Sequence, residues 1–161
     1  MESTITKAFE LVMLLCKKFN IDESHSLKHS MEVYNFALRI YESELPMNVY
    51  LEEQKDIIML AAILHDTIDK KYVNEADGIE EIRKYLNGVV KPEKLDIIFQ
   101  IITTMSYSTV KKNGFPLLGD YQLAYHIVRE ADLLAAYDID RCIMYSMYTK
   151  NANYSEALDA A

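Results

Sequence analysis

Histidine is scarce in this chain, and the positions of the histidines are the first indication of chemistry. Four occur in 161 residues, and His65 is followed by Asp66 at the end of the most apolar stretch of the sequence. A carboxylate at the end of a buried helix is costly unless something pairs with it. A divalent cation is an efficient partner, because imidazole nitrogen and carboxylate oxygen both bind such ions. Adjacent helical residues point about 100° apart, so a shared ion must lie near the helix end.

Two further polar residues lie on the apolar stripes of other helices. His29 shares a face with Val33, and Asp132 shares one with Val128 and Ala135. Both side chains are therefore expected to point toward the core. Together with the histidine–aspartate pair, three separate helices each offer a potential metal ligand to the interior. The alternative is that the histidine–aspartate dipeptide is incidental, and it is the residues on the other two helices that argue against this.

Hydrophobic periodicity predicts that helices position all of these residues. We expect helices over residues 4–18, from 22 or 24 to just before Pro46, and over 50–68, 79–86, 92–105, 121–136 and 138–149. Residues 69–78 are predicted to be a polar connection and residues 106–120 a loop. Only four Gly and three Pro occur, which disfavours turn-rich β architectures. The prediction is one compact all-α domain of six or seven helices over residues 1–161.

Composition limits the classes of partner and compartment. The formal net charge is −8, and an acidic chain repels a polyanion, so no nucleic-acid polymer is expected as a partner. A small anionic substrate is still allowed, because a metal ion reverses the field locally. No signal peptide and no apolar run of membrane-spanning length is found. We expect a cytoplasmic protein without membrane contact, with Cys16 and Cys142 as reduced thiols; a homo-oligomer is possible.

In this order the four residues resemble a known signature. His29, then His65-Asp66, then Asp132 are similar to the H…HD…D set of the HD-domain superfamily of metal-dependent phosphohydrolases. The flanking motifs also resemble those of small members: Ser24-His25 before His29, Asp69 and Lys71 after the central pair, Ser106-Tyr-Ser108 after a long helix, and Arg129-Glu-Ala before Asp132. The resemblance covers about residues 21–145, which is most of the chain.

The resemblance implies a helical HD-domain bundle with a defined chemistry. His29, His65, Asp66 and Asp132 would bind one divalent ion, which could be Mn, Fe, Co, Ni or Mg. Such an ion activates a water and polarises a phosphorus centre. Relatives with the most similar motif layout act on nucleotides, so the implied substrate is a small phosphorylated molecule, first of all a nucleoside tri- or monophosphate.

Fold does not determine substrate, so two other kinds of function remain open. One is a phosphodiesterase or a hydrolase of non-nucleotide phosphoesters. The other is a non-catalytic HD module that binds a nucleotide or a partner as a regulator.

The same resemblance suggests catalytic residues beside the metal ligands, of which Asp66 is itself counted as catalytic. Asp69 follows Asp66 by about one helical turn and could orient the attacking water or protonate the leaving group. Lys71, and next to it Lys70, could stabilise the charge that develops on the phosphoryl oxygens. The alternatives are an exposed carboxylate and two solvated lysines in a polar loop.

Other cations are candidates for contacts with the substrate phosphate. His25 precedes His29 by one helical turn on the same face, and Arg129 precedes the last metal ligand; Arg141 is a weaker candidate. A solvent-facing histidine at the start of a helix is the alternative for His25. Three departures from the family pattern, at Ser26, at Met105 and at residues 133–135, leave the phosphate contacts open and disfavour a second metal ion.

Overall fold

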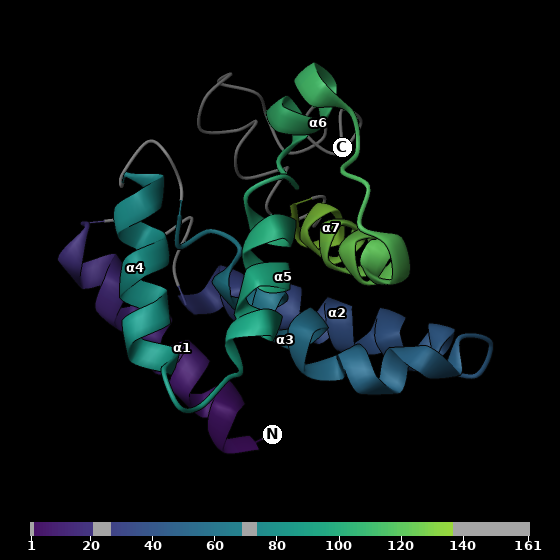
Figure 1. The fold of residues 1–161 in the computed structure, drawn as a ribbon, viewed down its shortest axis with the longest axis horizontal. Helices are drawn as coiled ribbons and strands as arrows, with labels where there is room; N and C mark the ends of the chain where they lie inside the picture. Colours follow the sequence, from purple (N-terminus) through teal and green to yellow (C-terminus); the bar gives the residue numbers. More distant parts are fainter. Residues whose placement is uncertain (1, 21–26, 69–73, 137–161) are drawn as a thin grey trace, which may run out of the picture.

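The computed structural model describes residues 2–20, 27–68 and 74–136, and all regular structure in these ranges is helical (Figure 1). The helices are, in chain order, α1 (Glu2–Lys18), α2 (Leu27–Glu44), the 3₁₀ helix η2 (Val49–Gln54), α3 (Lys55–Leu64), α4 (Glu75–Leu86), α5 (Pro92–Ile102), α6 (Tyr107–Asn113), the 3₁₀ helix η3 (Gly119–Tyr121) and α7 (Gln122–Ala136). The predicted all-α class is confirmed. The helix predicted over residues 138–149 lies outside the described residues.

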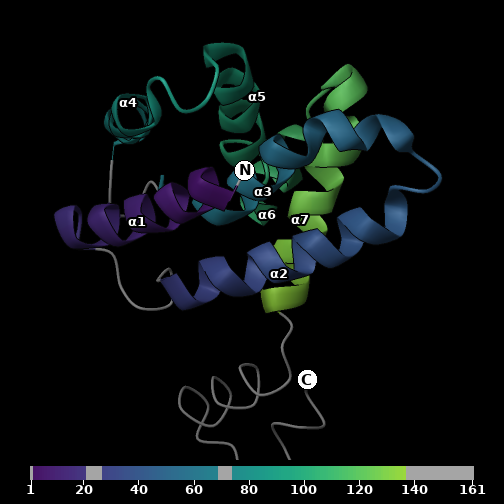
Figure 2. The ribbon, with the colours of Figure 1, turned by 90° about the horizontal axis from the view of Figure 1, so that it is seen from below.

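Helix α3 forms the centre of the bundle. Every residue from Ile57 to Leu64 is buried, and α3 packs against α1, α2, α5 and α7. Figures 1 and 2 show α3 enclosed by these helices from two perpendicular directions. A helix that is apolar on all sides can only be stable when it is covered on all sides, so the apolar sequence of α3 explains its central place.

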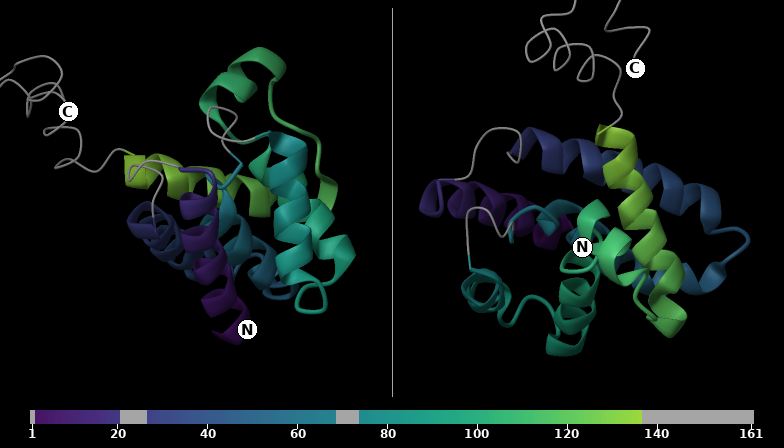
Figure 3. Two further views of the ribbon diagram at one scale, coloured as in Figure 1. Left: turned by 90° about the vertical axis from the view of Figure 1, so that its left-hand side faces the viewer. Right: turned by 90° about the horizontal axis from the view of Figure 1, so that it is seen from above.

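Helix α7 lies across α2, and this crossing brings the two ends of the sequence motif together. The two helices pack directly against each other, and Figure 3 shows α7 crossing α2 on the side of the bundle away from α4. The contact joins segments about a hundred residues apart in the chain, which local sequence patterns do not encode. None of the helices in the described ranges combines the length and apolar character that a bilayer crossing requires.

Three predicted boundaries are corrected by the structure. The helix predicted over 50–68 begins as the 3₁₀ helix η2 and its α-helical part ends at Leu64. Helix α4 begins at Glu75, inside the predicted polar connection, because the Asn74 side chain accepts hydrogen bonds from the backbone N–H groups of Ala76 and Asp77 and so caps the helix. The predicted loop 106–120 contains α6, which the hydroxyl of Ser106 caps by accepting from the N–H of Thr109.

Candidate metal centre

Two buried histidines from different helices face each other in the core. His29 lies in the first turn of α2, and His65 follows the last residue of α3. Only 8% of the His29 side chain and 2% of the His65 side chain are exposed. Their Nε2 atoms are 3.2 Å apart, which is contact distance for two nitrogen atoms.

The end of α3 sets the orientation of His65. Its Nδ1 lies 2.7 Å from the carbonyl oxygen of Ala62, and a carbonyl can only accept, so the proton of a neutral His65 is on Nδ1. The backbone N–H and the hydroxyl of Thr67 both donate to the carbonyl of Leu64, at 3.0 and 2.6 Å. These bonds satisfy a carbonyl that the ending helix would leave unpaired. Because Nδ1 of His65 faces the carbonyl of Ala62, Nε2 on the other side of the ring is directed at His29.

Two carboxylates complete the cluster. Oδ2 of Asp66 is 3.3 Å from Nε2 of His29 and 3.2 Å from Nε2 of His65. Oδ1 of Asp132, on α7, is 3.2 and 3.1 Å from the same two nitrogens. The Asp66 and Asp132 side chains are 23% and 31% exposed, so the cluster is closed on the histidine side and open to solvent beside the carboxylates.

The electrostatics of the cluster favour a bound cation. Burial lowers the pKa of His65, but the carboxylates of Asp66 and Asp132 raise it by more, so the pKa lies well above its ordinary value. The pKa of His29 is also raised, because hydrogen bonds to the two carboxylates outweigh burial. Burial raises the pKa of Asp132, but the two imidazoles lower it by more, to below its usual range. In the absence of a metal, the cluster therefore holds protons tightly.

The spacing of the donor atoms fits a divalent ion. One nitrogen each from His29 and His65 and one oxygen of Asp66 lie within 4.8 Å of one another, and Asp132 adds an oxygen in contact with both nitrogens. Ligands bound at about 2.1 Å in octahedral geometry stand about 3 Å apart, close to the distances between these atoms. Imidazole nitrogen with carboxylate oxygen suits Mn, Fe, Co or Ni, and carboxylate suits Mg.

Comparison with known protein families agrees with this geometry. A profile of the HD domain matches residues 26–139, a span that includes all four residues of the cluster. The chain belongs to the HD domain family. HD domains typically are phosphohydrolases that bind a divalent metal, and the His-His-Asp cluster of this HD domain could hold one. Searches of curated proteins and of solved structures return no match.

Several residues predicted to act beside the metal lie outside the described part of this HD domain. They are His25, Asp69, Lys70, Lys71 and Arg141. Their predicted roles in catalysis and phosphate binding remain predictions.

Arg129 lies within the described residues, one helical turn before Asp132 on α7. Its Nε is buried and has no hydrogen-bond partner among the described residues. Its guanidinium carbon is 5.3 Å from the centre of the Phe115 ring, and about half of Phe115 is exposed. Phe115 also packs against His126 in an edge-to-face arrangement. Phe115 was not among the residues predicted from the sequence to bind substrate. Its place between Gly114 and Pro116 in a polar segment is a pattern that could have indicated an exposed aromatic ring.

Proposed function

We propose that this HD domain hydrolyses a phosphate bond of a nucleotide, a nucleoside tri- or monophosphate. His29, His65, Asp66 and Asp132 would hold one divalent ion for this reaction. The observation that carries the proposal is the convergence of these four side chains, from three helices, within contact distance of one another. The ion would lower the pKa of a water and polarise the phosphorus centre.

The residues of the chain would orient the reaction and restrict water. The hydrogen bond from Nδ1 of His65 to Ala62 keeps Nε2 on the metal side, as second-sphere partners do in other metal sites. The buried histidines exclude water on one side, so substrate and water must approach beside the partly exposed carboxylates. In this scheme Asp69 would orient the attacking water or deliver a proton to the leaving group, and Lys71, with Lys70 and His25, would contact the phosphate.

Charge supports a role for Arg129. Two carboxylates neutralise a divalent ion, so an anionic substrate needs a further cation nearby. Arg129 lies one turn from Asp132, and its Nε has no partner among the described residues. A guanidinium presents several donors that match phosphate geometry.

An aromatic surface beside this cation favours a nucleotide over a simple phosphoester. Phe115 packs against the Arg129 guanidinium and is half exposed. An exposed aromatic ring is a surface on which a nucleobase can stack. A substrate with both phosphate and base could therefore use both residues.

A hydrolysis screen, in which nucleotide products and released phosphate are separated by chromatography, tests the proposal. The full chain, first stripped with EDTA, is supplied in turn with Mn, Fe, Co, Ni or Mg. It is then assayed on nucleoside tri-, di- and monophosphates, cyclic nucleotides and p-nitrophenyl phosphate. We expect hydrolysis of a linear nucleotide, lost in His65→Ala and Asp66→Ala while the helical circular dichroism is kept. Asp96→Asn, which changes an exposed aspartate paired with Arg83, is the matched control and should keep full activity.

Other outcomes would replace this function by a stated alternative. Activity on cyclic nucleotides alone would indicate a phosphodiesterase, and activity on p-nitrophenyl phosphate without nucleotide activity a hydrolase of other phosphoesters. A metal-loaded chain that binds nucleotides but hydrolyses none would be a regulatory module.

A further inference from the structure

The segment between α6 and η3 carries the most exposed large apolar side chain in the described part of the protein. This side chain is Leu117, which is 97% exposed. The segment is held on both sides of it, because Phe115 packs against the ring of His126 and the backbone N–H of Leu118 donates to the side chain of Gln122 at 2.9 Å. Leu117 therefore projects from a segment that is fixed to α7, so little conformational entropy is lost when it binds another surface.

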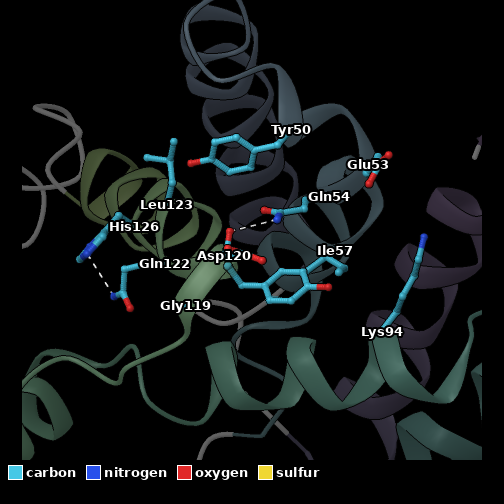
Figure 4. Close-up of a pocket in the computed structure, with 11 residues that line it drawn as sticks. Tyr50, Glu53, Gln54, Ile57, Lys94, Gly119, Asp120, Gln122, Leu123 and His126 are labelled. Atoms are coloured by element: carbon cyan, nitrogen blue, oxygen red, sulfur yellow. Dashed lines mark hydrogen bonds between the residues drawn. The ribbon is translucent and has the colours of Figure 1, made fainter.

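A cavity of about 1070 Å³ lies beside this segment. It is lined mainly by residues of η2, the start of α3, η3 and the start of α7 (Figure 4). Tyr50, Ile57 and Leu123 provide apolar surface in its wall, and Gly119, which follows Leu117 closely in the chain, is also part of the wall. The projecting leucine and the cavity are therefore neighbours on one surface. Since Leu117 is almost fully exposed, it does not fill the cavity of its own chain.

Further exposed apolar side chains extend this surface beyond the cavity. Met47 is 80% exposed at the turn before η2, and about half of Tyr50 is exposed. In Figure 1 the chain runs from α6 at the top down the right-hand side to the start of α7, and the turn between α2 and α3 lies below it. The hydrogen bond from Gln54 to the carbonyl of Asp120 holds η2 against η3. An exposed apolar surface that joins several elements marks an interaction site, and methionine and aromatic residues are enriched in such interfaces.

Charge divides this surface into a basic end and an acidic rim. The basic end consists of Lys111 and Lys112, both exposed in the last turn of α6 just before the projecting segment, and α6 contains no acidic residue. The acidic rim consists of Glu53 and Asp120, whose exposed carboxylates line the cavity. Lys94 also lines the cavity, but its ammonium is already in an ion pair with a carboxylate of α3. The projecting segment and the cavity are thus complementary in charge as well as in apolar character.

We propose that this surface binds a second copy of the chain and forms a two-fold symmetric dimer. In such an interface every contact occurs twice, because the same surface of both copies takes part. Leu117 of each copy enters the cavity of the other, and the basic end of each copy lies against the acidic rim of the other. Burial of the apolar side chains supplies most of the affinity, and the charges fix the relative orientation of the two copies.

A second copy is the occupant that this surface fits, because one chain supplies both halves of the contact. The basic end stands out in a chain whose net charge is −8, so another copy of the same acidic chain attracts it. None of the four residues of the metal cluster lines the cavity, and Ile57 in its wall precedes His65 on α3 by about 12 Å at 1.5 Å per residue. Dimer formation therefore does not require the metal ion.

Analytical ultracentrifugation of the full chain in EDTA tests the proposal. We expect a species of twice the mass of one chain that dissociates on dilution, with a dissociation constant of about 10 μM or tighter. Leu117→Glu places a charge in the apolar cavity of the other copy and should raise this constant by about 30-fold or more, as loss of a central interface residue does. Leu14→Glu, at a half-exposed position of α1 outside this surface, is the matched control and should leave the constant unchanged. Both variants should keep the helical circular dichroism.

Two charge-reversed variants test the symmetry of the dimer. Lys111→Glu with Lys112→Glu makes both ends of the surface acidic, and Glu53→Lys with Asp120→Lys makes both ends basic, so each variant alone should dimerise about tenfold more weakly or worse. When the two variants are mixed, opposite charges meet in both halves of the interface, and a heterodimer should form. A wild-type chain that stays monomeric, a dimer that Leu117→Glu leaves intact, or charge variants that do not recover association when mixed would each overturn the proposal.

Discussion

The Nε2 atoms of His29 and His65 lie 3.2 Å apart, with a carboxylate oxygen of Asp66 and one of Asp132 in contact with both. Because Nδ1 of His65 faces the carbonyl of Ala62, a neutral His65 presents an unprotonated nitrogen to His29. Two nitrogens and two carboxylate oxygens at this distance require a shared positive charge. Protons and a divalent ion therefore compete for the space between these four atoms.

Removal of one ligand should abolish tight metal binding. Loss of second-sphere partners alone lowers metal affinity by about 10–100-fold, so His29→Ala or Asp132→Asn should lower Mn²⁺ affinity by about 100-fold or more. Elemental analysis after gel filtration and titration calorimetry measure the effect. The Asp96→Asn control should keep one ion per chain; an unchanged ion content in His29→Ala would show that the ion is bound elsewhere.

The stability of the metal-free protein should fall as the pH rises above about 6.5. The pKa values of His29 and His65 are raised above 6.5 in the fold. Their contribution is therefore fully present below pH 6.5 and is lost as the pH rises through the raised values. Asp132, with a lowered pKa, contributes above its ordinary value of 3.8 and loses this contribution in acid. The cluster thus stabilises the metal-free fold most between about pH 4 and 6.5.

A bound divalent ion should restore the stability that the metal-free fold loses at alkaline pH. Metal binding requires neutral imidazoles, so the rise in Tm on adding Mn²⁺ should be small at pH 6 and larger at pH 8. Thermal unfolding in EDTA and in Mn²⁺ across this range measures both curves. A Tm increase that shrinks with rising pH, or that persists in His65→Ala, would contradict the assignment.

Arg129 should affect substrate affinity without affecting the metal. Hydrogen bonds to charged groups are worth about 1.5–3 kcal/mol, so Arg129→Met should raise KM for an anionic substrate by about 10–100-fold. The metal content should stay the same, because Arg129 is not a ligand, and Arg129→Lys should recover part of the loss. Steady-state kinetics at saturating metal decides this. A fall in metal content at unchanged KM would assign Arg129 a structural role, and a fall in kcat at unchanged KM would assign it a contact made only in the transition state.

The stability of the fold should be most sensitive to truncation of buried side chains on α3. Leu60 is fully buried in α3, and Leu60→Ala should lower the free energy of unfolding by about 2–5 kcal/mol through lost burial and a residual cavity. Leu14 on α1 is about half exposed, so Leu14→Ala is the matched control and should change stability far less. Urea unfolding followed by circular dichroism measures both variants, and equal losses would contradict the central position of α3.

Local patterns in the sequence were sufficient for the helical class and for the position of α3. The apolar run from Ile57 to Leu64 has no polar face, which favours a helix at the centre of the bundle, and the structure confirms this. The order of His29, His65-Asp66 and Asp132 indicated the HD domain family, which the profile match confirms. The residue at which a helix starts could not be predicted from periodicity alone, because a side-chain cap such as Asn74 extends a helix into a segment without apolar periodicity.

The distances between the four side chains were decided by tertiary structure alone. Periodicity places a residue on one face of its own helix, but the crossing of α2 and α7 depends on how their side chains interdigitate, over a separation of 103 residues between His29 and Asp132. The pairing of Phe115 with Arg129 is likewise a contact made by packing. The hydrogen bond from Nε2 of Gln54 to the carbonyl of Asp120 likewise exists only because η2 meets η3 across 66 residues of chain. Sequence spacing determines which residues are available, and the packing of helices determines which of them meet.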